Sequence, residues 1–360
     1  MQPPSSEPRA TMPDLKLSVT ICSWNTREDL RACLASLEKE FKNPPLREGR
    51  ERDLQPKTSS DGPSQKTATP KHRSTEPAED SNAANRQPPT ANCAARFEVI
   101  VIDNNSRDGS ADMVAQDFPW VRLFRMDQNL GFTGGHNFAL QRREGQHAFL
   151  LNSDTVVHRG ALRELVDFLE ARPEVGIVAP KLLNPDGSLQ YSARRFPNPV
   201  AAMFRNTFLG RLFPKNRYTR DYLMQDWDHA SEREVDWVSG AAFLVRDEVM
   251  EKVGLFDTDY FMYCEDVDWC WRTWKAGYKV VYDPAAVVTH AIGRSTDQVA
   301  NKMILRFHVS MLRFYRKNTL PEMTPVARPF AYALACAALT ARAMLFITKN
   351  GVDALRRKFK

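Results

Sequence analysis

Three carboxylates stand within four positions, at Glu265, Asp266 and Asp268. Clustered acids repel one another, so bringing them together costs free energy unless a cation or a catalytic task uses them. On a helix, Glu265 and Asp268 share a face while Asp266 points elsewhere, and Arg272 stands four residues beyond Asp268. The spacing therefore predicts that one carboxylate serves catalysis while another pairs with Arg272. The alternative is an acidic helix start that matches the helix dipole.

A second polar pair, Asn152 and Asp154, follows the apolar run 148–151. Side chains at i and i+2 fall on the same side of an extended segment, and an amide oxygen with a carboxylate suits Mg²⁺ or Mn²⁺. Such a cation would bridge diphosphate oxygens and offset the charge of a departing nucleotide. His290 at a later strand end can complete the site, and Arg294 can bind phosphate. The alternatives are a helix cap at 152–154 and a structural histidine.

Two further motifs indicate a nucleotide. Asp103 ends an apolar run and precedes a polar turn, where a carboxylate can accept hydrogen bonds from a nucleobase or ribose; the alternative is that the turn only caps the next helix. Three glycines surround Phe132 in segment 129–137, and glycine lets the backbone approach a ligand closely. We interpret this segment as a glycine-rich loop, with an ordinary loop as the alternative. No Gly-Lys-Ser/Thr follows, so it is not a Walker A loop.

The elements that must position these residues alternate along the chain. Strand-like runs cover 17–22, 97–102, 121–126, 148–151, 177–180, 235–245 and 279–282, and helical patterns cover 29–39, 112–117, 138–143, 161–171 and 266–276. The alternation predicts an α/β fold with a mostly parallel central sheet and helices on both faces. Ligands of such sheets bind at the carboxyl ends of strands, which directs attention to the loops after Ile102 and Leu151. Segment 190–235, rich in aromatics and arginine, is interpreted as a mobile segment over the site.

Composition bounds the class of protein. The chain has 360 residues, of which 42% are hydrophobic and 26% charged, so it forms one large domain or two ordinary ones and is not collagen, a coiled-coil rod or fully disordered. Its six cysteines include no C-x-x-C pair, which disfavours a zinc knuckle or a disulfide scaffold and favours a reducing cytosol. No signal peptide is visible.

Two segments read as disordered. Residues 1–14 form a Pro/Ser-rich leader, and residues 43–95 contain eight prolines with only Leu46 and Leu54 from the large apolar types. Such segments cannot bury enough apolar surface to offset the entropy of ordering. Because strand-like sequence resumes at Phe97, we interpret 43–95 as a disordered insertion inside one domain that spans 15–296.

Residues 297–360 are expected to form a helical region. An amphipathic helix is predicted at 299–317, and 330–348 is an Ala/Leu-rich stretch with only Arg342 charged, close to the length that spans a bilayer. A buried or interfacial helix is favoured over a span, because Arg342 is costly at a bilayer centre. The net charge of +6 is concentrated here, which favours contact with an anionic membrane surface.

In order, the motifs are Trp24-Asn25, VIDNNSRDGS, NLGFTGGHN, LLNSD, GLFDTDYFMYCEDVDWCWR and the His290 segment. Together they resemble glycosyltransferase family 2, which has the GT-A fold, and within it the rhamnosyltransferase-like branch. The resemblance covers residues 17 to about 318, apart from 43–95.

The resemblance implies a role for each matching residue. Donor nucleotide-sugar contacts are implied for Trp24, Asn25, Asp103, Gly131, Phe132, Gly135, Asn137, Asn152 and Arg294. Asp154 and His290 are implied to bind Mg²⁺ or Mn²⁺, and Asp266 to act as general base. Support of the acceptor or the site is expected of Glu265, Asp268, Trp237 and Gly240. Asn152 replaces the first Asp of the family's Asp-x-Asp motif, which removes one formal charge at the metal.

The implied function is an inverting transfer of a sugar, with L-rhamnose from dTDP-rhamnose favoured, to a cell-surface glycan or lipid-linked acceptor. The expected place is the cytoplasm, peripheral on the inner face of the cytoplasmic membrane. The alternatives are another donor, namely UDP-GlcNAc, UDP-galactose or GDP-mannose, and a nucleotide-sugar-binding protein without catalysis. Nucleic acid is not expected as a partner, since the basic residues are confined to the C-terminus and no recognition module is present.

Overall fold

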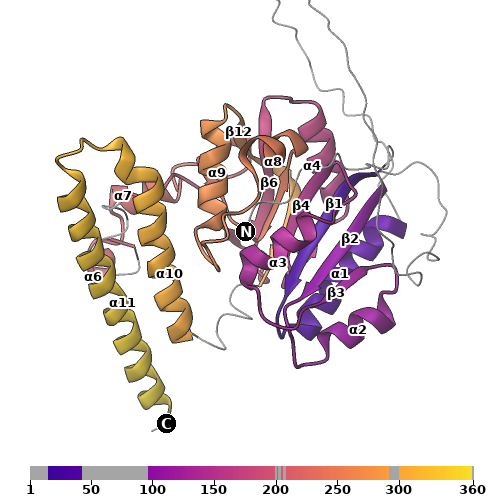
Figure 1. Cartoon of the computed structure of the whole chain (residues 1–360), viewed down its shortest axis with the longest axis horizontal. Helices are drawn as coiled ribbons and strands as arrows, with labels where there is room; N and C mark the ends of the chain where they lie inside the picture. The colour runs from indigo at the N-terminus through magenta and orange to yellow at the C-terminus, as the bar shows by residue number, and fades with distance from the viewer. Residues whose placement is uncertain are drawn as a thin grey trace, which may run out of the picture.

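A ten-stranded sheet forms the centre of the protein (Figure 1). The computed structural model describes residues 15–42, 96–198, 201, 204–205, 208–291 and 300–358. The predicted leader 1–14, the insertion 43–95 and Arg294 lie outside these ranges. The main path of the sheet runs β3 (Arg122–Arg125), β2 (Arg96–Asp103), β1 (Leu15–Ser23), β4 (His147–Asn152), β11 (Ala242–Val245), β6 (Val175–Leu183), β12 (Lys279–His290) and β5 (Thr155–Val157).

Most neighbouring strands are parallel. The block β3–β2–β1–β4 is parallel throughout, and β6 is parallel to β12. β11 runs antiparallel between β4 and β6, and β5 runs antiparallel at the edge. The short strand β7 (Leu189–Gln190) pairs antiparallel with β6, and β9 (Arg233–Glu234) pairs antiparallel with β12. A separate two-stranded sheet is formed by β8 (Ala193–Arg194) and β10 (Trp237–Val238). The predicted α/β fold with a mostly parallel central sheet is therefore confirmed.

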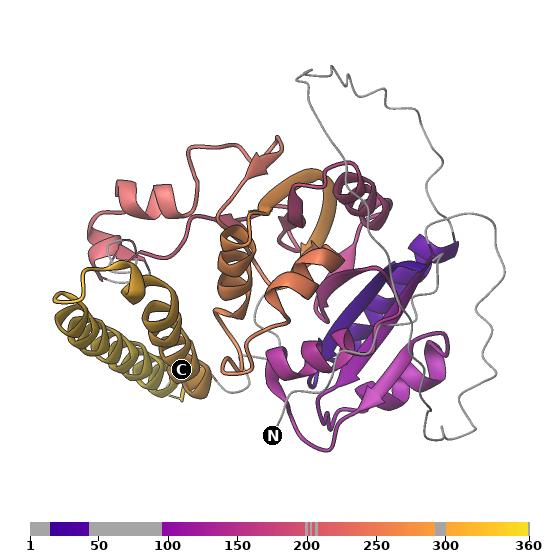
Figure 2. The same ribbon diagram turned by 45° about the horizontal axis from the view of Figure 1, so that its top comes forward.

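Helices cover both faces of this sheet (Figures 1 and 2). Phe149 and Leu151 of β4 pack into one core with α1 (Arg27–Lys42), α2 (Ser110–Asp117) and α4 (Ala161–Glu170). Leu150, between them, packs into a second core with α8 (Asp247–Val253) and α9 (Glu265–Lys275). α3 (Gly131–Leu140) contacts β1 and β2. Alternate residues of a strand face opposite sides, so one strand supplies both cores.

The polar strand ends come together at one edge of the sheet. Ser23 of β1 is paired with Asp103 of β2, and Cys22 of β1 is paired with Asn152 of β4. Because the three strands are parallel and adjacent, the loops that follow them are neighbours. The sequence prediction that the loops after Ile102 and Leu151 share one site is consistent with this register.

The glycine-rich segment is a helix, so its interpretation as a loop with a helix beginning at Phe138 is wrong. α3 begins at Gly131, which has φ +75°. A side chain at Gly131 would clash with the main chain of Phe261, and one at Gly135 would clash with the Cys22 thiol. Both glycines therefore allow close contact between protein segments, and this packing outweighs their low intrinsic helix propensity.

The single strand expected at 235–245 is also wrong. Its residues are divided between β10 and β11, with a break at Ser239–Ala241 that includes Gly240. Segment 190–235 likewise forms short elements, namely β7, β8, α6 (Phe208–Leu212), α7 (Arg217–Tyr222) and β9.

Two long helices follow the sheet and lie side by side away from it (Figures 1 and 2). We call α10 (Ala300–Phe314), α11 (Arg328–Lys358) and their connection the C-terminal hairpin; the connection contains a π-helical turn, Tyr315–Thr319, and a 3₁₀ turn, Leu320–Glu322. Both predicted helices are confirmed. Segment Arg328–Val352 is long and apolar enough to cross a membrane by length and composition, and only 6% of its most apolar window is buried. Burial of this helix in the protein, one of the two favoured readings, is therefore wrong.

Candidate active site

Hydrogen bonds join the loops at the carboxyl ends of β1, β2 and β4. Asn25 has φ +52°, its main-chain N–H donates to Ser106 Oγ at 3.0 Å, and its Oδ1 accepts from the Arg107 N–H at 2.8 Å. The hydroxyls of Thr26 and Ser153 are 2.9 Å apart. These contacts connect three loops that are distant in sequence, so the edge of the sheet is ordered before any ligand binds.

Asp103 lies at the centre of this edge with one unused acceptor. Its side chain is buried, and Oδ2 accepts from the Ser106 N–H at 3.2 Å. Oδ1 is buried and has no hydrogen-bond partner in the described part of the chain. A buried acceptor left unpaired costs about 1–3 kcal/mol, so the site favours a ligand that brings an N–H or O–H donor. Trp24 and Asn25 follow the strand that pairs with Asp103.

Asn152, Asp154 and His290 converge beside this loop cluster. His290 Nε2 lies 3.3 Å from Asp154 Oδ1 and 3.3 Å from Asn152 Nδ2. The other ring nitrogen, Nδ1, is 2.7 Å from Gln190 Oε1. The sequence predicts that Asn152, Asp154 and His290 share one site. The structure brings them together from the end of β4, the turn after it and the end of β12.

The hydrogen bonds of Gln190 define which histidine nitrogen carries the proton. Its amide N–H groups donate to Asn184 Oδ1 at 2.9 Å and to the His290 main-chain oxygen at 3.1 Å, so Oε1 faces the ring. An amide oxygen only accepts, which places a proton on Nδ1; in the neutral ring, the Nε2 lone pair then faces the Asp154 carboxylate. Two electron-pair donors that face one another fit a shared cation, and a hydrogen bond to the far nitrogen is the usual support for a histidine ligand.

The donor set is small for a metal site. Within the described ranges, no group of three or more His, Cys, Asp and Glu side chains is arranged to bind a metal ion. One carboxylate and one imidazole therefore fit a divalent cation that is bound weakly by the protein alone and completed by oxygens of a ligand, while the amide nitrogen of Asn152 is turned toward the histidine ring.

Asp266 lies next to the end of β4. Its Oδ2 accepts from the Gly240 N–H at 2.9 Å and its Oδ1 from the Val267 N–H at 2.8 Å, and the residue is only partly buried. The adjacent residue Ala241 accepts a hydrogen bond from the Asn152 N–H at 2.9 Å. Two consecutive residues therefore connect the Asp266 carboxylate to the strand end that carries the cation-binding group.

The protein raises the pKa of both acids at the start of α9. Burial raises the pKa of Asp266, while the hydrogen bonds from Gly240 and Val267 and the charge of Arg194 act in the opposite direction. Burial and the neighbouring Asp266 raise the pKa of Glu265 well above its ordinary value. Glu265 is buried, whereas Asp266 has access to solvent. A raised pKa in an accessible carboxylate suits a general base.

A strained turn precedes these two acids. Tyr263 and Cys264 both adopt left-handed backbone conformations, with φ +71° and +65°. Such a conformation costs a non-glycine residue about 1–3 kcal/mol and persists where the surrounding structure imposes it. The turn begins α9 so that Glu265 points into the core and Asp266 points toward Gly240.

Asp268 has a structural position. It is fully buried and accepts from Arg272 Nε at 2.8 Å, which confirms the predicted pairing. Lys317 Nζ lies 2.9 Å from Oδ1, and Asn318 Nδ2 donates to the same oxygen at 2.9 Å. Asp268 therefore joins α9 to the π-helical turn of the C-terminal hairpin. Its contacts are structural, and we call them the Asp268 joint; they replace the direct role at the site that the sequence predicts for it.

Several other residues predicted at the site make contacts within the protein itself. Asn137 uses its whole amide on Phe256, with bonds of 2.9 and 3.1 Å, and, like Gly131 and Gly135, packs α3 against its neighbours. The Phe132 ring closes on Gly240: a Cβ placed at Gly240 would lie 3.3 Å from Phe132 Cζ.

Trp237 lies beside the same site. Its indole N–H donates to the Arg195 main-chain oxygen at 2.7 Å, and the Arg194 guanidinium lies 5.0 Å from its ring centre. Sequence reasoning missed Arg194 and Gln190. Each contacts a residue more than 40 positions away in sequence, Gln190 with His290 and Arg194 with Trp237. The short strands that carry them also give no periodic pattern that would identify them.

Comparisons with known proteins identify the family of the chain. The family model "Glycosyltransferase like family 2" matches residues 88–306. The N-acetylglucosaminyl-diphospho-decaprenol L-rhamnosyltransferase of Mycobacterium tuberculosis (strain ATCC 25618 / H37Rv) is 34% identical over 228 residues, which are 60% of this chain and 73% of that protein. Rhamnosyltransferase WbbL of Escherichia coli (strain K12) is 29% identical over 148 residues, 41% of this chain and 53% of WbbL.

A solved structure with a similar chain path is the mannosyltransferase PcManGT from Pyrobaculum calidifontis in complex with GDP-Man and Mn²⁺. It is 17% identical and has a TM-score of 0.47 over 97% of this chain and 84% of its own.

Proposed function

The chain belongs to glycosyltransferase family 2, and from this premise we propose that it transfers L-rhamnose from dTDP-rhamnose to a lipid-linked acceptor with inversion at the anomeric carbon. The observation that carries the proposal is the position of Asp266. Its carboxylate is bound by the Gly240 N–H, one residue from the Ala241 carbonyl that bonds the end of β4. A base therefore lies beside the loops that suit a nucleotide.

Asp266 acts as the general base in this proposal. It takes the proton from an acceptor hydroxyl as that oxygen forms a bond to the anomeric carbon, and the bond to the nucleoside diphosphate breaks with its electron pair. One displacement inverts the configuration and needs no covalent enzyme intermediate. General-base catalysis contributes about 10²–10⁴-fold in rate.

The sheet edge supplies the donor site. Asp103 Oδ1 is the buried acceptor that a pyrimidine N–H would satisfy. Asp154 and His290 would bind the divalent cation, and Gln190 holds the histidine ring in the orientation this requires. When bound, that cation would offset the charge of the leaving diphosphate. The choice of rhamnose is supported by the rhamnosyltransferases among the relatives.

The acceptor and its location are supported by the C-terminal hairpin. Large apolar side chains are exposed on both helices, namely Leu305, Val309, Phe330, Leu334, Met344 and Leu345. Basic residues follow α11's apolar stretch in sequence, at Lys349 and 356–358. An exposed apolar face with a basic end suits the anionic inner face of the cytoplasmic membrane, where a lipid-linked acceptor is found.

A donor panel tests this function. dTDP-rhamnose, UDP-GlcNAc, UDP-galactose and GDP-mannose are each incubated with the full chain and a short-chain lipid-diphosphate acceptor, and nucleoside diphosphate release is measured with and without EDTA. We expect the largest release with dTDP-rhamnose, a loss of release in EDTA, and an inverted linkage in the product by NMR. Preference for another donor contradicts the rhamnose assignment. Donor binding without turnover across the panel contradicts catalysis.

A further inference from the structure

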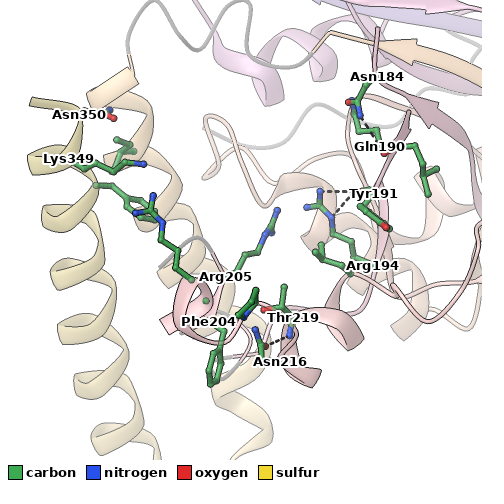
Figure 3. Close-up of a pocket in the computed structure, with 17 residues that line it drawn as sticks. Asn184, Gln190, Tyr191, Arg194, Phe204, Arg205, Asn216, Thr219, Lys349 and Asn350 are labelled. Carbon is green, nitrogen blue, oxygen red and sulfur yellow. Dashed lines mark hydrogen bonds between the residues drawn. The ribbon is translucent and has the colours of Figure 1, made fainter. Parts of the chain in front are cut away.

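A basic cavity of about 830 Å³ lies between the C-terminal hairpin, the α6–α7 segment and strands β7 and β8 (Figure 3). Lys349 and Asn350 of α11 line one side, and Gln190 and Arg194 line the opposite side. The proposed function above assigns nothing to this space.

The cations of the cavity have no acidic partners. Seventeen residues line it, and they include Arg194, Arg205, Arg211 and Lys349 but no Asp or Glu. None of these four forms an ion pair with another residue in the part of the chain that is described. The Arg194 guanidinium donates to the Tyr191 main-chain oxygen at 2.8 and 3.0 Å, and the carboxylate on which its charge acts, Asp266, does not line the cavity.

Two of these charges, on Arg194 and Arg205, are also partly withdrawn from water, whereas Arg211 and Lys349 are exposed. Burial, and then the charge of Arg194, lowers the pKa of Arg205, whose Nη1 donates to the Tyr222 hydroxyl at 3.4 Å. Placing like charges in a semi-enclosed space costs free energy unless an anion neutralises them. Arginine pairs with phosphate through two parallel hydrogen bonds. The arginines of the cavity therefore favour a phosphate group over a neutral ligand.

Two residues of the cavity wall, Arg194 and Gln190, connect it to the candidate active site. Arg194 is close enough to Asp266 to act on its carboxylate, and it packs over Trp237. Gln190 lines the cavity and bonds His290 on its other side. At the far end, Ile304 and Phe346 of the hairpin form an apolar wall. An anion bound here would be followed by the base in one direction and by the apolar hairpin in the other.

We propose, on the basis of the function above, that this cavity binds the diphosphate of the lipid-linked acceptor, so that the acceptor sugar reaches Asp266 and the lipid chain leaves along the hairpin. A diphosphate supplies at least two negative charges to the four cations. A free phosphate, or the headgroup of a membrane phospholipid, shares part of this chemistry and must be distinguished by experiment.

Binding of farnesyl diphosphate to the full chain, measured by calorimetry in EDTA, tests the proposal. EDTA removes the cation that would otherwise let the diphosphate bind at Asp154 and His290. We expect Arg205→Gln and Arg194→Gln each to weaken binding by about ten- to hundredfold, the usual loss for a charge-assisted hydrogen bond. Arg220→Gln removes the same charge from the exposed surface of α7 outside the cavity and should bind as the parent does.

The other ligands separate the sources of phosphate. Farnesol should not bind, and inorganic diphosphate should bind more weakly than farnesyl diphosphate but with the same dependence on Arg205. Affinity for phosphatidylglycerol vesicles should be the same in all variants. If the vesicles lose affinity in the arginine variants as farnesyl diphosphate does, the cavity binds a phospholipid headgroup and the proposal is wrong.

Two readouts separate this proposal from the proposed function. Equal farnesyl diphosphate affinity in the parent, Arg194→Gln and Arg205→Gln, with transfer intact, overturns the cavity assignment and leaves the function standing. Affinity for dTDP should not change in any variant, because Asp103, the proposed contact of the base, is not among the residues that line the cavity. If Arg205→Gln lowers the thermal midpoint, Arg211→Gln on the exposed wall of the cavity answers the same question.

Discussion

The sheet edge and the cavity beside α11 are built in opposite ways. At the sheet edge, the loops after β1, β2 and β4 bond one another through Asn25 and Ser153, so most polar atoms already have partners. In the cavity, Arg194 and Arg205 line a partly open space whose wall has no carboxylate. The first region is organised before binding, whereas the second depends on a ligand for its charge balance. The difference indicates that donor geometry is preset and that acceptor binding supplies missing interactions.

The largest effect is expected at Asp266. Asp266→Asn keeps the hydrogen bond from Gly240 but removes the base, so the turnover number should fall about 10²–10⁴-fold while the thermal midpoint is unchanged. The matched control is Asp226→Asn, an exposed acid outside the site. Turnover near that of the parent in purified Asp266→Asn would show that another group takes the proton.

Substitution of Asp268, two residues away, should lower the stability of the protein rather than its turnover. Asp268→Ala leaves Arg272 and Lys317 partly buried without their shared partner, and we expect the free energy of unfolding to fall by about 3–5 kcal/mol. Denaturant melts measure the loss, with Asp226→Ala as control. Asn318→Ala removes one of the same bonds and should cost less, about 1–3 kcal/mol. Unchanged stability in both variants would contradict the claim that the contacts of Asp268 with the π-helical turn stabilise the protein.

Gln190 sharpens the comparison because it borders both regions. Gln190→Ala removes the acceptor that directs His290, so Mn²⁺ affinity should fall about 10–100-fold. Gln190→Glu keeps an acceptor for Nδ1 and should retain more affinity than Gln190→Ala. Mn²⁺ titration followed by electron paramagnetic resonance measures binding without turnover. The exposed residue Gln141 gives the control Gln141→Ala, and equal affinity in Gln190→Ala would remove His290 from the cation site.

The smallest effect concerns pH. The charge of Arg194 lowers the pKa of Asp266, so Arg194→Gln should raise that pKa further. A base works only when deprotonated, and activity is lost as pH falls through its pKa, so the acid limb of kcat/KM should move to higher pH. Rates measured across the acid limb for the variant and for Arg220→Gln test this. A limb that stays in place, or moves down, contradicts the proximity of Arg194 to the base.

Much of the donor side could be predicted because it follows from local rules. Asp103, Asn152 and His290 each end a strand, and parallel neighbouring strands bring their ends to one edge. The pairing of Asp268 with Arg272 needs only helical spacing. The family then assigned roles that spacing alone left open.

What could not be predicted depends on contacts between distant segments. Gly131 and Gly135 look like a flexible loop, and only the positions of Phe261 and Cys22 show why glycine is needed inside a helix. Gln190 and His290 are 100 residues apart, and no pattern announces their bond. The cavity likewise joins Arg194 to Lys349, so its charge balance is invisible to any local window.

The joint at Asp268 has a consequence for how the protein would work at a surface. Lys317 and Asn318 bond this carboxylate from the π-helical turn, while Asp266 lies on the same helix two residues earlier. If the hairpin lies on the bilayer as proposed, its depth and tilt fix the height of the reactive carboxylate above the lipid. The membrane would then act as a ruler, selecting acceptors whose hydroxyl stands at that height and rejecting glycans that are a sugar too short or too long.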